Sequence, residues 1–138
     1  MNHDEAVRLA VYRGYVNDGR PPSVEEMAVE LAVSADAVRE SLHLARHVVL
    51  RDDAIVMAHP FASIPLGFSV MGRDMLWWGG CAWDSFAIPQ LVPDDPEVLV
   101  ATQCPGCGKP LSWVVNREAP PVGDEVAHFL VPMSDCWD

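Results

Sequence analysis

The sequence predicts a mixed α/β (α+β) fold, in which a three-helix, winged-helix-like lobe precedes a small mixed or antiparallel sheet packed with one central helix. Before residue 47, three segments combine helical apolar spacing with helix-start residues; after it, short apolar segments alternate with turns. The apolar run 77–91, WWGGCAWDSFAIPQL, supplies the central helix. The 138 residues suit two small lobes, which we place at 1–60 and 61–138.

The first lobe should contain three amphipathic helices. Residues 3–17 carry apolar side chains at roughly helical spacing and end at Asp18-Gly19, before two prolines. Ser23 precedes two glutamates and is a good N-cap for a helix that ends near residue 32. Ser34 repeats this signal, with Asp36 in the first turn of a helix that extends to about residue 46.

A hairpin should follow the helices, because residues 47–60 form two short apolar runs around Asp52-Asp53. Three helices and a hairpin have the outline of a winged helix-turn-helix, which either reads DNA or serves only as a packing lobe. A DNA-reading third helix would present Arg39, Glu40, Ser41, His43, Arg46 and His47. The 9 basic and 20 acidic residues give a net charge of -11, which repels phosphate, so we expect no nucleic-acid partner.

The second lobe should consist mainly of strands. Residues 60–65 form a connection, residues 72–74 form a turn that leads into residues 75–78, and strands are expected at 67–71, 97–102, 111–115 and 125–131. The loop CPGCGKP joins the second and third of these strands into a hairpin.

Cys81 and Asp84 are the main candidate site residues. If the chain is helical after the two glycines, they are i, i+3 neighbours on one face. Apolar surroundings would raise the pKa of the carboxyl group towards that of a useful proton donor and shield a soft sulfur ligand from water. Three tryptophans would enclose such a dry pocket: Trp77, Trp78 and Trp83. In the alternative interpretation, Cys81 is a small buried residue and Asp84 caps a helix that starts at Ser85.

Cys104 and Cys107 form a Cys-x-x-Cys motif with three interpretations: a knuckle that shapes the hairpin, an auxiliary site for zinc or another soft metal, or a redox pair. A complete zinc site would need two more ligands, from Cys136, His128, His59 or a second chain. Cys136 is either part of an exposed tail or a mobile thiol that passes a metal onward. His128 is either a ligand or an ordinary strand residue.

The composition bounds the setting in which the protein works. Half of the residues are apolar and 21% are charged, as in globular proteins. No run approaches the roughly 18 apolar residues of a membrane span, and the first residues lack the apolar core of a signal peptide, so we expect a cytoplasmic protein with no membrane partner. In that compartment the four cysteines are better suited to metal binding or catalysis than to disulfides.

Residues 71–115 resemble the organomercurial (alkylmercury) lyase family. The segment Cys81-Ala82-Trp83-Asp84 stands in the place of the family's Cys-x-x-Asp. The match continues with Phe86, Pro89 and Leu91, and then with Cys104, Gly108, Pro110, Leu111 and Ser112. A weaker match follows at residues 127–132, and the three-helix outline also fits what the family carries ahead of its catalytic lobe.

The resemblance implies a detoxifying enzyme that cleaves a carbon-mercury bond by protonation. Cys81 would bind the mercury of a small organometallic substrate, and Asp84 would carry the proton. The family's second catalytic cysteine lies further along than residue 138, so either the natural chain continues, Cys136 takes that role, or the second thiol is absent. No cofactor is required, mercury being part of the substrate and product.

The partners implied are a mercury-accepting thiol or reductase, and a homodimer is also conceivable. The alternative function is a soft-metal-binding or metal-sensing protein that cleaves nothing. It would use all four thiols: Cys81, Cys104, Cys107 and Cys136.

Overall fold

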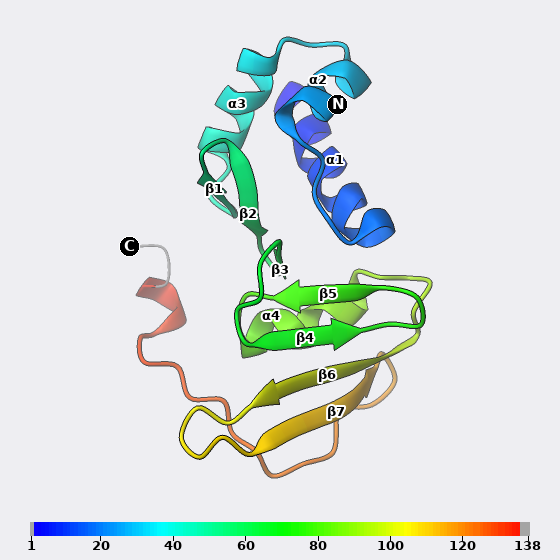
Figure 1. Ribbon diagram of the computed structural model, residues 1–138, viewed down its shortest axis with the longest axis vertical. Helices are drawn as coiled ribbons and strands as arrows, with labels where there is room; N and C mark the ends of the chain where they lie inside the picture. Colours follow the sequence, from blue (N-terminus) through cyan, green and yellow to red (C-terminus); the bar gives the residue numbers. More distant parts are fainter. Residues whose placement is uncertain (1, 136–138) are drawn as a thin grey trace.

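The computed structural model describes residues 2–135 and shows three helices at one end of the molecule and a sheet with a further helix at the other (Figure 1). The helices of the first lobe are α1 (His3–Asp18), α2 (Val24–Leu31) and α3 (Ala35–Leu44). All three predicted helices are confirmed. Within the described residues, no helix is both long enough and apolar enough to cross a membrane.

The starts of these helices follow from their capping residues. Asn2 accepts the backbone N–H of Glu5, and Ser34 accepts that of Ala37. Ser23 forms a complete capping box with Glu26, so two otherwise unsatisfied N–H groups of α2 are paired. These local hydrogen bonds explain why the helix starts could be predicted from the sequence.

One seven-stranded antiparallel sheet runs through both parts of the molecule. Its order is β1-β2-β3-β5-β4-β6-β7. The strands are β1 (Val48–Arg51), β2 (Ala54–Ala58), β3 (Phe61–Ala62), β4 (Phe68–Met71), β5 (Leu76–Gly79), β6 (Glu97–Gln103) and β7 (Pro110–Asn116). The predicted hairpin around Asp52-Asp53 is confirmed. The residues predicted as a plain connection contain β3, a two-residue strand that joins the hairpin to β5.

The central helix is shorter than the apolar run predicts. It comprises α4 (Ala82–Ala87) and the 3-10 turn η1 (Ile88–Gln90), while Trp77 and Trp78 belong to β5. Helix α4 packs on β4 and β5, and Figure 1 shows it against one face of these strands. The core is continuous between the lobes: the buried indole of Trp77 donates to the carbonyl of Tyr15 in α1 at 2.7 Å.

The strand predicted at residues 125–131 is wrong. This stretch has no regular structure, and Val126 and Leu130 are 88% and 92% exposed. A short apolar run forms a strand only where a neighbouring strand pairs with it, and β7, at the sheet edge, pairs with β6 alone. The chain continues to a short 3-10 turn, η2 (Met133–Asp135).

Candidate thiol and carboxyl active site

The candidate site lies where β5 passes into α4. Cys81 is the extended N-cap residue of α4, and Asp84 lies in its first turn. Ser85 stabilises this β5–α4 corner, because both its backbone N–H and its hydroxyl donate to the carbonyl of Cys81, at 3.0 and 2.7 Å. The thiol of Cys81 and the carboxyl group of Asp84 lie close enough to shift each other's pKa, so the predicted pair is brought together.

Asp84 is a buried acid with a basic partner. Its side chain is 1% exposed, and Nδ1 of His59 lies 2.8 Å from its Oδ1. The two atoms are at ion-pair distance, although their angles are not those of a well-aligned hydrogen bond. A buried carboxylate without a nearby positive or donor group is costly, so His59 is what makes this position tolerable for an acid.

The pairing of β3 with β5 brings His59 to Asp84. Phe61 pairs with Gly79, and the N–H of Gly80 donates to the carbonyl of Pro60 at 3.4 Å. The register therefore sets His59 beside the first turn of α4. Its carbonyl accepts the hydroxyl of Tyr12 in α1 at 2.6 Å, so the helical lobe holds the histidine from the other side.

Two glycines leave room for the site. A Cβ atom at Gly79 would collide with the hydroxyl of Ser85, and one at Gly80 would collide with Oδ2 of Asp84 and the terminal methyl of Met57. The glycine pair therefore permits close contact between the end of β5 and the first turn of α4.

Burial shifts the proton affinity of both candidate groups in the same direction. Burial raises the pKa of the Asp84 carboxyl above its ordinary value of 3.8, while His59 and Cys81 oppose the shift. Burial also raises the pKa of the half-buried Cys81 thiol, helped by the charge of Asp84 and opposed by the N–H groups of α4. The site thus favours a protonated thiol beside a carboxyl group that can accept and return a proton.

Three sequence-based expectations need correction. The tryptophans do not form a dry wall around Cys81, because Trp77 is directed into the core and Trp83 is 63% exposed. Asp84 does not cap a helix starting at Ser85, because the helix begins at Ala82 with Cys81 as its N-cap. His59, named only as one option for a zinc ligand, pairs with Asp84; no local sequence signal links two residues so far apart in the chain.

The other candidate ligands do not gather into a closed metal site. Among residues 2–135, no group of three or more His, Cys, Asp or Glu residues is arranged to hold a metal ion. Cys104 and Cys107 are free thiols in the β6–β7 loop, His128 is exposed in the C-terminal stretch, and Cys136 lies outside the described residues. A four-ligand zinc site is therefore not assembled in this part of the chain.

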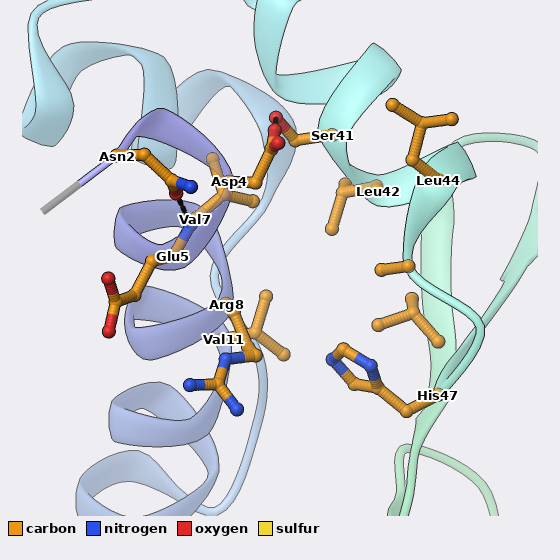
Figure 2. A pocket seen from close by; sticks show the side chains of 12 residues that line it. Asn2, Asp4, Glu5, Val7, Arg8, Val11, Ser41, Leu42, Leu44 and His47 are labelled. Atoms are coloured by element: carbon orange, nitrogen blue, oxygen red, sulfur yellow. Dashed lines mark hydrogen bonds between the residues drawn. The ribbon is translucent and has the colours of Figure 1, made fainter.

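A pocket of about 370 Å³ lies in the helical lobe, between α1, α3 and the start of β1 (Figure 2). Asp4, Arg8 and His47 are among its lining side chains, and neither Cys81 nor Asp84 is. The pocket is linked to the candidate site only through His47, whose ring stacks on Tyr12. The hydroxyl of Tyr12 in turn donates to the carbonyl of His59. We therefore assign the chemistry to the β5–α4 corner.

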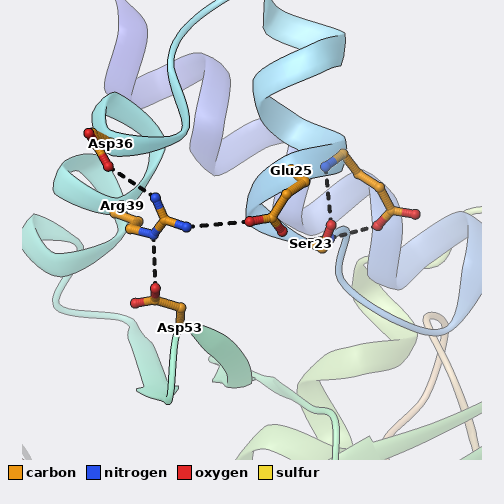
Figure 3. A network of polar contacts seen from close by, with 6 residues as sticks. Ser23, Glu25, Asp36, Arg39 and Asp53 are labelled. Carbon is orange, nitrogen blue, oxygen red and sulfur yellow. Dashed lines mark hydrogen bonds and ion pairs between the residues drawn. The ribbon is translucent and has the colours of Figure 1, made fainter.

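The third helix directs its arginine at acidic side chains. Figure 3 shows Arg39 bound to Asp36, Glu25 and Asp53, with N to O distances of 3.0, 3.3 and 2.8 Å. Ser41 is buried, and its hydroxyl donates to Asp4. Two of the side chains expected on a DNA-reading face are thus occupied within the protein.

The fold and the site define a mixed helix and antiparallel-sheet protein with a thiol and a buried acid at one helix start. The sequence matches the alkylmercury lyase (MerB) family over residues 61–138, more than half of the chain. The chain therefore belongs to the alkylmercury lyase family.

One solved structure, described as the mercury-bound form of MerB2, is similar to this chain with a TM-score of 0.65 and 15% sequence identity. The match covers 87% of this chain and 58% of that one, so the chain spans little more than half the length of this relative. At that identity the likeness concerns the fold. No curated protein sequence matches the chain.

Proposed function

We propose that this protein cleaves a carbon-mercury bond by protonolysis, with Cys81 as the mercury-binding thiol and Asp84 as the proton carrier. The observation that carries the proposal is the buried Asp84 carboxyl group, which lies beside the Cys81 thiol at the start of α4 and 2.8 Å from His59. Membership of the alkylmercury lyase family supports the reaction class.

The proposed sequence of steps balances without a cofactor. The Cys81 thiol forms a sulfur-mercury bond to R-Hg⁺ and gives its proton to Asp84. A second thiolate adds to the mercury and pushes electron density towards the carbon, since sulfur is the softest ligand a protein owns. Asp84 then protonates the carbon, the carbon-mercury bond breaks, R-H leaves, and Hg(II) stays bound to two sulfurs.

The second thiol is assigned to Cys136 as a proposal, on the ground that it is the one cysteine of the sequence outside both the Cys81–Asp84 segment and the Cys104–Cys107 loop. An external thiol is the alternative donor. The two are separated by Cys136→Ser: a loss of turnover that excess external thiol does not restore would favour Cys136.

The experiment that tests the function is headspace detection of methane or benzene from methylmercury or phenylmercury in excess thiol. Cys81→Ser should reduce release to background. Asp84→Asn, which keeps the shape of the side chain, should slow it about 10²- to 10⁴-fold, the usual contribution of a general acid. His128→Ala is the control, because this exposed side chain lies outside the site. Mercury binding without hydrocarbon release by the wild type would refute the lyase proposal.

A soft-metal binder or sensor is the second candidate function. The observation that favours it is the pair of free thiols at Cys104 and Cys107. Stoichiometric binding of Zn(II), Cu(I) or Hg(II) with no hydrocarbon released would support it. For either function we propose a cytoplasmic setting and no nucleic-acid partner, the latter because Arg39 is engaged by three carboxylates.

A further inference from the structure

The loop between β6 and β7 holds two thiols that the proposed cleavage does not use. The N–H of Gly108 donates to the carbonyl of Cys104 at 2.8 Å, and the N–H of Cys104 donates to that of Lys109 at 2.9 Å. Gly108 has a φ of +73°, a conformation that glycine adopts at no steric cost. This tight turn brings Cys107 close enough to Cys104 to contribute to the lowered pKa of the Cys104 thiol.

The electrostatic environment of this loop is opposite to that of Cys81. The N–H groups of Cys107 and Gly106 point at the sulfur of Cys104 and lower the pKa of that thiol, with a further contribution from Lys109. Cys104 is half-buried and Cys107 is exposed, and neither is in a disulfide. The loop therefore lowers the pKa of one thiol and exposes the other, whereas burial at the β5–α4 corner raises the pKa of the Cys81 thiol.

Sheet topology sets this loop at the same sheet end as Cys81. Strands β5 and β6 both run antiparallel to β4, so their C-terminal residues, Gly79 and Gln103, lie at the same end of the sheet (Figure 1). Only β4 lies between them. Two strand spacings correspond to roughly 10 Å between the backbones.

We propose that Cys104 and Cys107 form a second mercury site, which takes Hg(II) from Cys81 as a two-coordinate bis-thiolate and presents it to thiols outside the protein. The origin of the ion rests on the proposed lyase function. The described residues add no third His, Cys, Asp or Glu ligand, which suits Hg(II) and leaves Zn(II) two ligands short.

The transfer is ligand exchange without oxidation or reduction. The thiolate of Cys104 forms a bond to mercury as the first bond to a site sulfur breaks, and Cys107 then replaces the second sulfur. Two mercury-sulfur bonds form and two break, so mercury stays Hg(II), and each departing thiolate takes up one proton from solvent in place of the proton that each incoming cysteine has given up. Cys107 is exposed and Cys104 is partly exposed, so both sulfurs are accessible to the incoming mercury, as such an exchange requires.

The binding test isolates the two thiols. The chain has four cysteines, so Cys81→Ser/Cys136→Ser leaves only Cys104 and Cys107. Reduced variant is titrated with HgCl₂ in excess monothiol and followed by mercury-thiolate absorbance and native mass spectrometry. We expect one Hg(II) per chain, and about 10²-fold weaker retention when Cys104→Ser is added, because one thiolate cannot chelate. Loss of the ion to the monothiol, or one ion bridging two chains, would overturn the proposal.

The transfer test uses the full chain with an organomercurial. Cys104→Ser/Cys107→Ser should lengthen the interval between hydrocarbon release and the appearance of Hg(II) on an external dithiol, by about tenfold if exchange through the exposed thiolate is the main route. An unchanged interval would refute the transfer step. If the wild type releases no hydrocarbon, the lyase proposal fails while the binding test still decides whether the second site exists.

Discussion

Replacing His59 with phenylalanine should destabilise the protein by an amount that grows with pH. The substitution leaves the Asp84 carboxyl group, 1% exposed, without the partner that lies 2.8 Å away. An unpaired buried charge costs about 3–5 kcal/mol. The folded chain can avoid this cost by keeping Asp84 protonated. Holding that proton lowers the free energy of unfolding by about 1.4 kcal/mol for each pH unit above the ordinary pKa of 3.8.

The smaller of these two penalties sets the expected loss. It is at most about 1.6 kcal/mol at pH 5 and about 4 kcal/mol at pH 7, because the pKa of Asp84 is already raised in the wild type, which therefore carries part of the same penalty. The sign follows from proton binding: removing His59 removes the charge that lowers the pKa of Asp84, so the folded variant holds more protons than the folded wild type and its stability falls more steeply as the pH rises.

Urea denaturation of wild type and variant between pH 5 and pH 8 measures this difference. His59→Phe/Asp84→Asn is the matched control, because it retains any packing cost of the phenylalanine but has no carboxyl group to titrate. The reasoning is refuted if the loss in the single variant is independent of pH, or if the double variant shows the same slope.

Two further substitutions test the geometry of the corner and of the lobe contact. Gly80→Ala should lower stability by about 1–3 kcal/mol in thermal denaturation and impair turnover, because the added Cβ collides with Oδ2 of Asp84. Gly106→Ala is the control: its added Cβ would make only an ordinary 3.8 Å contact, so its stability should be nearly unchanged. Trp77→Phe should cost about 0.5–1.5 kcal/mol in urea denaturation, because the buried carbonyl of Tyr15 loses the indole N–H and keeps only the backbone N–H of Gly19; a loss under 0.5 kcal/mol, the size of an ordinary surface effect, would contradict this.

Local signals made much of the fold predictable. The capping serines, Ser23 and Ser34, mark helix starts through hydrogen bonds within three residues, and the Asp52-Asp53 turn lies between its own two strands. Pairing between distant segments was not readable in the same way. The two residues of β3 are too few to produce a pattern, and residues 125–131 are mostly apolar although no strand pairs with them in the described chain.

The same distinction applies to the site. The contact between Cys81 and Asp84 depends on a spacing of three residues across a helix start, so the sequence alone predicts it. The contact between Asp84 and His59 depends on the register in which Phe61 pairs with Gly79, and no sequence feature near His59 indicates that register. The family resemblance identifies Cys81 and Asp84, whereas His59, the partner of Asp84, is identified only by the pairing of β3 with β5 in the structure.

The two thiol environments at this end of the sheet suit opposite halves of one reaction. Protonolysis needs a proton kept near the mercury, and burial supplies it by raising the pKa of both the Cys81 thiol and the Asp84 carboxyl group. Release of Hg(II) needs the reverse, an accessible thiolate, and the N–H groups around Cys104 favour that form. A single thiol cannot be both shielded and exposed, so separating the two tasks between the β5–α4 corner and the β6–β7 loop is what the physical chemistry of sulfur favours.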